Sequence, residues 1–153
     1  MPQIAESVQS LAVTLWVGAL WTVGLMVAPT LFQFVPDRIV AGSIAGRLFT
    51  YTALLGLGCG AYLLLFRLTR FGAHAFRQAF FWVALLMVIF AMVGQFGIQP
   101  ILEALRERAL PRQVMESVLR DRFAAWHGVA SVLYVIECAL GAALVLLQAR
   151  APN

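Results

Sequence analysis

Four long stretches of the chain are apolar and almost free of charge, and they restrict the possible folds more than any other feature. Three of them, 7–36, 48–66 and 78–102, contain no charged residue, and the fourth, 123–149, contains only Glu137. The hydrocarbon core of a bilayer is about 30 Å thick and is crossed by about 20 apolar residues in helical form. Each stretch is near or above that length, so the sequence predicts four membrane spans.

The composition excludes the main soluble classes. Hydrophobic residues make up 62% of the chain and charged residues 12%, whereas soluble domains have about 45 to 50% apolar and about 25% charged residues. A secreted disulfide scaffold, a nucleic-acid-binding domain and a soluble enzyme are therefore excluded. The class that remains is a helical membrane protein whose first partner is the lipid bilayer, and we expect no nucleic acid to bind.

The spans are expected to be helices, because backbone polar groups in lipid must be paired within the segment unless a barrel closes. The uninterrupted apolar run 79–90 lacks the alternation of a barrel strand. We predict an all-α fold in which residues 1–153 form a single domain, an integral membrane four-helix bundle. The predicted spans are about 9–32, 47–68, 78–101 and 125–148.

The connection between the third and fourth spans has an amphipathic pattern of its own. Arg112, Glu116 and Arg120 are spaced four residues apart, so opposite charges neighbour one another on one helix face, while apolar residues occupy the other face. The pattern predicts an amphipathic helix over about 111–122, at the membrane interface or across the end of the bundle. This helix is either a packed connector or a docking element for a partner.

An even number of spans places both termini on one side of the membrane. That side also receives the short loop after the second span, which carries Arg67, Arg70 and Arg77 and no acid. Basic residues near span ends are enriched on the cytoplasmic side, although the opposite side has arginines too, mixed there with acids. We expect the termini inside, in a bacterial cytoplasmic membrane.

The two halves of the chain share a weak repeat. Val23-Gly24 stands before Pro29, and Val93-Gly94 stands before Pro100. Two helical hairpins of the same orientation would be related by an axis along the membrane normal, as in parallel internal repeats. Chance coincidence is the alternative interpretation.

Polar side chains inside the fourth span form a stripe. His127, Ser131, Tyr134 and Cys138 recur on one helix face, which should point into the bundle and away from lipid. Glu137 lies deep in the same helix, where an ionised carboxylate is costly unless it is protonated or paired. It is therefore either a proton- or cation-handling acid or a protonated packing residue.

Several further residues gather toward the side away from the termini. All four spans contribute to this predicted polar vestibule, which consists of Pro29, Arg47, Gln95, Gln99, Trp126, His127 and Ser131. The sequence favours a non-enzymatic protein that binds or passes a small solute or ion there, or supports a membrane partner, including a second copy. No catalytic residue, metal site or cofactor is predicted, and the alternative is that these side chains bond only water, loop backbone and one another.

A competing hypothesis is a haem- or metal-linked redox membrane protein that uses His127. The only other histidine, His74, belongs to the loop on the opposite side of the membrane, so one chain cannot hold a haem between the two. The haem would have to be bound by His127 alone, or by the His127 residues of two copies across a dimer. A purely structural subunit is a third possibility.

Short motifs along the chain resemble those of a known family. They are Trp16-Val17-Gly18, Val27-Ala28-Pro29-Thr30-Leu31-Phe32, Ala41-Gly42-Ser43-Ile44-Ala45-Gly46-Arg47-Leu48-Phe49, Gln99-Pro100, and Trp126-His127-Gly128 with Ser131. In this order they are similar to the DUF4149 / TMEM205-like family of four-helix membrane proteins. The resemblance implies a small multi-pass protein with no assigned reaction and an architecture similar to that of copper-resistance D-type membrane proteins. It does not include Glu137.

Overall fold

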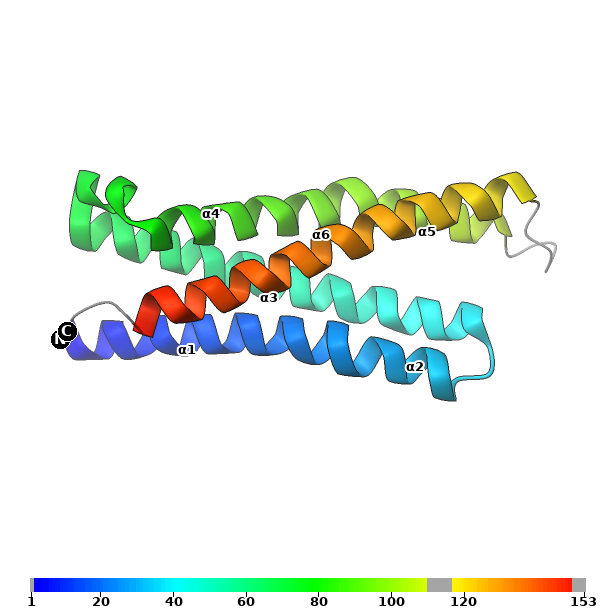
Figure 1. The fold of residues 1–153 in the computed structure, drawn as a ribbon, viewed down its shortest axis with the longest axis horizontal. Coiled ribbons are helices and arrows are strands. Elements are labelled where there is room, and N and C mark those ends of the chain that lie inside the picture. The colour runs from blue at the N-terminus through cyan, green and yellow to red at the C-terminus, as the bar shows by residue number, and fades with distance from the viewer. Residues whose placement is uncertain (1, 110–116, 150–153) are drawn as a thin grey trace.

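The computed structural model describes residues 2–109 and 117–149, and within them the chain is helical with short connections and no strand. The all-α prediction is thus confirmed. Four long rods are joined by two turns and by the undescribed residues 110–116 (Figure 1). In chain order the elements are α1 (Pro2–Trp21), the π-helix η1 (Thr22–Val27), α2 (Ala28–Phe34), α3 (Arg38–Phe71), the 3-10 helix η2 (Gly72–Arg77), α4 (Ala79–Met92), the π-helix η3 (Val93–Ile98), α5 (Gln99–Ala109) and α6 (Ser117–Ala149).

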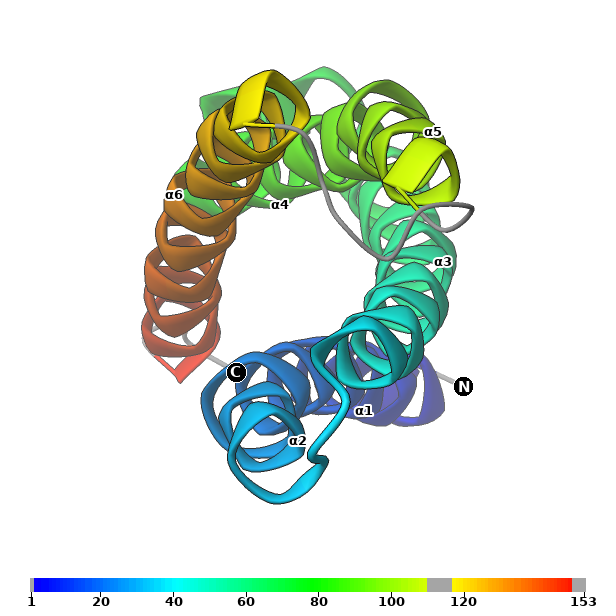
Figure 2. The same ribbon diagram turned by 90° about the vertical axis from the view of Figure 1, so that its right-hand side faces the viewer.

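The rods form a closed ring around one core (Figure 2). α3 packs on α1 and α4, and α6 packs on α4 and α1. We call the end that holds the start of α1, η2 and the end of α6 the terminal end (Figure 1). The opposite end, with the α2–α3 connection, the end of α5 and the start of α6, is the distal end. α6 starts beside α5 at the distal end and crosses the bundle diagonally to reach α1.

The turn between α2 and α3 follows from two residues. Pro36 disfavours the helical conformation of the residue before it, and Val35 is extended, with φ −89° and ψ 114°. Asp37 then caps the next helix, because its Oδ1 accepts hydrogen bonds from the backbone N–H groups of Ile39 at 2.8 Å and Val40 at 3.3 Å. The chain therefore reverses here and α3 begins at once.

We expect Asp37→Ala to lower the free energy of unfolding by about 1 kcal/mol, because two N–H groups at the start of α3 lose their acceptor. Asp37→Ser should retain most of the stability, since a serine hydroxyl also caps helices. Unfolding in detergent, followed by circular dichroism, measures both variants. Equal stability of the two variants would contradict the capping role.

The π-helices explain how two rods, α1–η1–α2 and α4–η3–α5, continue as helices although each contains a proline. Each begins seven residues before a proline, η1 at Thr22 before Pro29 and η3 at Val93 before Pro100. Proline lacks an N–H group and its ring collides with the carbonyl of the preceding turn, and a wider turn is one way to accommodate this in a continuing helix.

The same features support the internal repeat. α1 packs on α3 as α4 packs on α6, and α2 packs on α3 as α5 packs on α6. The two π-helices lie at matching places in the two halves. This correspondence favours a parallel repeat over chance.

The core is centred on one aromatic ring. Trp16 is fully buried, and Leu63, Met87 and Leu144 are buried in the same cluster. The ring lies against Gly56 and Gly60 of α3, which have no side chain to hold it away. Helices in lipid associate mainly through such close packing, because lipid chains are as apolar as the core.

The predicted amphipathic helix over about 111–122 lies only partly within the described residues. Residues 111–116 lie outside the described residues, and 117–122 form the first turns of α6, which runs to Ala149 without a break. Neither proline nor glycine occurs from Ser117 to His127, so the helix has no reason to end before the apolar span.

Candidate functional site

Two glutamines on the rod formed by α4, η3 and α5 project polar groups into the distal half of the bundle. Gln99, the first residue of α5, donates a hydrogen bond from Nε2 to the carbonyl of Gly46 on α3 at 3.2 Å. Gln95, one turn earlier in η3, is half-buried, and its Oε1 is shielded from solvent without a hydrogen-bond partner among residues 2–109 and 117–149. An amide oxygen in that state costs free energy until a donor reaches it, so Gln95 marks a place where a bound molecule would be stabilised.

A guanidinium group meets the same part of α3. Arg106 on α5 lies over Gly42 and Gly46, where added Cβ atoms would be 3.7 Å and 3.4 Å from its nitrogens. The one ion pair within 4.0 Å in the described ranges joins Arg70 to Glu6 at the terminal end. Arg106 therefore has no carboxylate partner within that distance in the described ranges, and its guanidinium places a positive charge against this part of α3.

A groove separates α5 from the start of α6. It has a volume of about 420 Å³ and is lined by Pro100, Ile101, Ala104, Leu105, Arg108, Arg122 and Trp126. Trp126 is 38% exposed. The groove thus presents one aromatic ring and two arginines on the surface of the distal end.

The polar stripe of α6 is divided by the tilt of the helix. Tyr134 is half-buried, donates its hydroxyl to the carbonyl of Leu20 at 2.6 Å, and meets the ring of Phe49 edge-on with centroids 5.0 Å apart. His127 and Ser131 lie on the same face nearer the distal end, where both are exposed. Near the distal end, α2 packs on α3 and α6 packs on α5. The distal part of the stripe is therefore not covered by another helix.

His127 and Ser131 make mainly local contacts. The His127 ring stacks on Phe123 one turn away, with centroids 5.9 Å apart. The Ser131 hydroxyl donates to the His127 carbonyl at 2.8 Å within the helix. Neither side chain is joined by a hydrogen bond or ion pair to the two glutamines in the part of the chain that is described.

Glu137 occupies the interior below this site. It is 8% exposed and lies in α6 next to Cys138, whose carbonyl accepts a hydrogen bond from Trp21 Nε1 at 3.1 Å. Across residues 2–109 and 117–149, no hydrogen bond or ion pair to its carboxylate is found. A buried acid without a partner in a membrane helix is a candidate for a functional group.

The structure therefore brings together only part of the predicted vestibule. Gln95 and Gln99 share the interior site near α3, and Trp126 lines the separate groove. Pro29, Arg47, His127 and Ser131 are exposed. The elements that carry these residues, namely α2, the first part of α3, η3 with α5, and the first half of α6, extend toward the distal end (Figure 1).

Sequence reasoning missed Arg106 and its contact surface. The spacing of Gly42 and Gly46 is a small-xxx-small pattern, which indicates a close approach by another element. That signal was present in the sequence, but it does not say that the approaching group is a guanidinium. Only the packing of α5 near α3 does so.

The fold defines the class of protein. Four helices, Ile4–Phe34, Arg38–Arg77, Ala79–Arg108 and Val118–Ala149, are long and apolar enough to cross a membrane, and the chain is a multi-pass α-helical membrane protein. It belongs to the DUF4149 family, a domain of unknown function, which it matches over residues 11–111. No curated protein and no solved structure matches the chain.

Proposed function

We propose that this protein binds a small polar solute within the distal half of its bundle, without catalysing a reaction on it. The observation that carries the proposal is the Gln95 amide oxygen, which is buried and has no hydrogen-bond partner. A solute that donates a hydrogen bond to this oxygen would remove an unfavourable burial. Passage of the solute across the membrane would extend the same function.

The charge near the site narrows the class of solute. Arg106 lies against the α3 backbone at Gly46, which also accepts the hydrogen bond of Gln99. An unpaired guanidinium repels cations and attracts anions. The favoured solute is therefore neutral or anionic and carries a hydroxyl or another hydrogen-bond donor. Glu137, deeper in α6, would form the inner limit of the site as a protonated acid.

The proposed setting is a bacterial cytoplasmic membrane with the termini in the cytoplasm. Arg67, Arg70 and Arg77 at the terminal end support this orientation, because basic residues near span ends are retained on the cytoplasmic side. The solute site would then open toward the periplasm. A reporter fused after Asn153 tests the orientation.

Calorimetric titration of the purified protein with glycerol, lactate and methylammonium tests the solute class. We expect glycerol and lactate to bind and methylammonium not to bind. Gln95→Leu should weaken lactate binding by about tenfold, since the solute donor loses its buried acceptor. The stability of this variant should be unchanged or higher, because an unpaired polar group is removed.

Gln148→Leu is the matched control. Gln148 Oε1 is also buried without a partner, but this residue lies near the end of α6, where its Nε2 donates to Ser10 Oγ at 2.7 Å. Lactate affinity should not change in this variant. If Gln95→Leu and Gln148→Leu bind lactate equally well, the proposed site is wrong.

A visible absorption spectrum addresses the competing redox hypothesis. His74 lies in η2 at the terminal end and His127 lies near the start of α6 at the distal end, so the two cannot hold one haem within a chain. A Soret band that disappears in His127→Ala would overturn the binding function proposed above and support a haem protein.

A further inference from the structure

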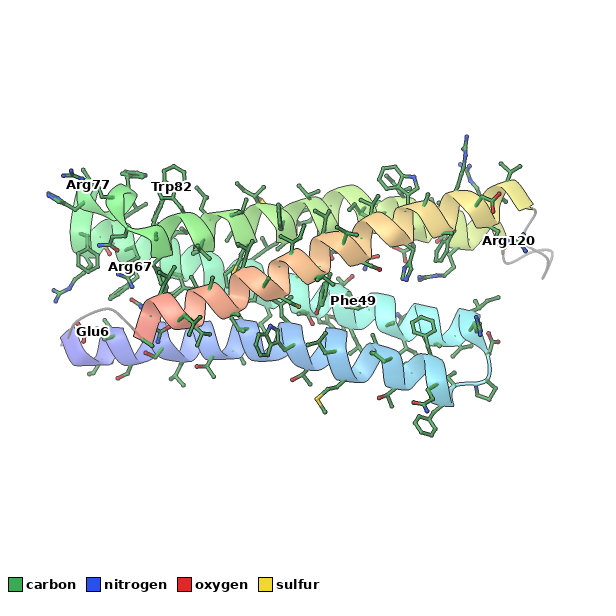
Figure 3. All side chains as sticks on the ribbon, in the orientation of Figure 1. Glu6, Phe49, Arg67, Arg77, Trp82 and Arg120 are labelled. Carbon is green, nitrogen blue, oxygen red and sulfur yellow. The ribbon has the colours of Figure 1, made fainter. Side chains whose placement is uncertain are left out.

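An arginine is buried at the terminal end of the bundle, at the opposite end from the proposed solute site. Arg67 lies in α3 one turn before the helix ends at Phe71 and is 7% exposed. In Figure 3 it lies on the side of the molecule that also carries Arg77, Trp82 and Glu6. Arginine is almost never buried to this extent unless its charge is paired.

The contacts of this guanidinium are neutral. Nη1 donates to the Gln78 side-chain oxygen at 2.9 Å, and the group lies 4.2 Å from the centre of the Phe80 ring and 5.4 Å from that of Phe71. Its Nε is buried and has no hydrogen-bond partner in the described part of the chain. These contacts hold the guanidinium in place but leave the Nε donor without an acceptor and the positive charge without an acidic partner in the described ranges.

Among the described residues, no acid pairs with this charge. The sequence has no aspartate or glutamate between Asp37 and Glu103, so α3, η2 and α4 carry none near Arg67. Glu6 is paired with the exposed Arg70 at 4.0 Å. Within the described ranges no carboxylate lies within 4.0 Å of Arg67, and Arg77 adds further positive charge at this end.

The depth of Arg67 matches the interface between lipid and water. The Phe80 ring on which it lies belongs to the first turn of α4. Trp82, also in that turn, is 54% exposed and donates from Nε1 to the Phe76 carbonyl at 2.8 Å. Exposed tryptophans with a bonded N–H are typical of the headgroup level. Phosphate groups of lipids are found at the same level.

We propose that Arg67 binds a phosphate group at the terminal end of the bundle, supplied by an anionic phospholipid headgroup or by free phosphate. Arginine is suited to this ligand because its planar fork can donate two parallel hydrogen bonds to phosphate oxygens. The aromatic rings and Gln78 orient the fork, and the phosphate supplies the missing negative charge. This site is independent of the solute site near Gln95.

Native mass spectrometry of the full chain, released from mixed phosphatidylglycerol and phosphatidylcholine micelles, tests the proposal. We expect the wild type to retain phosphatidylglycerol about tenfold more strongly than phosphatidylcholine, and Arg67→Gln to lose this preference. Arg70→Gln is the matched control. It removes an exposed arginine one turn further along α3, and the lipid preference should persist.

Inorganic phosphate distinguishes the two sources. If it displaces phosphatidylglycerol from the wild type, the site accepts the free anion, whereas resistance to displacement assigns the site to the lipid headgroup. Both results support a phosphate site. Equal retention of the two lipids by the wild type, or an unchanged preference in Arg67→Gln, would overturn it.

A second variant covers the case in which Arg67→Gln does not fold. Arg67→Lys keeps the positive charge but lacks the planar fork. We expect it to fold and to retain phosphatidylglycerol less strongly than the wild type does. Retention equal to that of the wild type would also overturn the proposal, because any cation would then suffice.

Discussion

Gly60→Ala is expected to lower the free energy of unfolding by about 2 to 3 kcal/mol, within the upper range for an overfilled core. A Cβ at this position would overlap the Val88 side chain and press on the Trp16 ring. Trp16 is fully buried, so it has no space into which it can turn. Gly56→Ala should have a similar effect, because its Cβ would overlap the indole ring of the same tryptophan.

Gly58→Ala provides the control for this prediction. Gly58 lies between the two on α3, is exposed, and a Cβ there would meet nothing within 4 Å. The control should be neutral or slightly stabilising, because alanine is the better helix former. Unfolding in mixed micelles with increasing SDS, monitored by circular dichroism, measures all three variants. Equal losses at the three positions would show that helix packing around Trp16 is not the cause.

A double-mutant cycle makes the same test sharper. In a Trp16→Leu background the indole ring is absent, so Gly56→Ala should cost less than it does in the wild type. Residues in direct contact show interaction energies of about 0.5 to 3 kcal/mol in such cycles. Strictly additive effects would contradict the contact between Trp16 and Gly56.

Gly24→Ala is expected to have the second large effect. Gly24 lies in η1, and a Cβ there would overlap the Tyr134 ring of α6. The ring would have to move, and with it the hydroxyl that donates to the Leu20 carbonyl at 2.6 Å. We expect a loss of about 2 kcal/mol, from overpacking and from the lost hydrogen bond together.

The other π-helix supplies a matched control. Gly94 lies in η3, and a Cβ there would meet nothing within 4 Å, so Gly94→Ala should change stability by less than about 0.5 kcal/mol. Tyr134→Phe isolates the hydrogen bond, since it keeps the ring, and should cost about 1 kcal/mol. Detergent unfolding compares the three variants. A loss in Gly94→Ala as large as that in Gly24→Ala would mean that glycine is needed by the π-helix itself.

The different surroundings of the two π-helices also distinguish the two halves of the repeat. In η1 the Tyr134 ring of α6 lies against Gly24. In η3 the side chain of Gln95 enters the interior and finds no protein partner. The first half is thus closed by a side chain of the protein itself, and the second half presents the polar group on which we base the solute site.

The sequence predicted the candidate site only in outline. It placed Gln95 and Gln99 in the distal half of the third rod, and their positions along the helix follow from counting residues within a span. It grouped them with His127 and Ser131, which the structure leaves exposed on the uncovered face of α6. The diagonal course of α6 causes this difference, and a course of that kind is not encoded in any one segment.

The terminal end shows the same limit. Arg67, Arg70 and Arg77 have the same appearance in the sequence, as basic residues around a short loop. The structure buries Arg67 against Phe80 and Gln78 and leaves the other two exposed. Phe80 lies in the first turn of α4 and Gln78 immediately before it, so only the packing of this segment against α3 distinguishes Arg67 from its neighbours.

The sequence alone determined the class of protein and the number of spans. It could do so because the bilayer sets the length of an apolar helix and backbone groups in lipid must pair within the segment. The tertiary structure decided which helix faces turn inward, which glycines contact an aromatic side chain of another helix, and which polar groups remain unpaired. In a membrane the core and the lipid are both apolar, so hydrophobic periodicity hardly distinguishes inside from outside, and the close packing of side chains makes that choice.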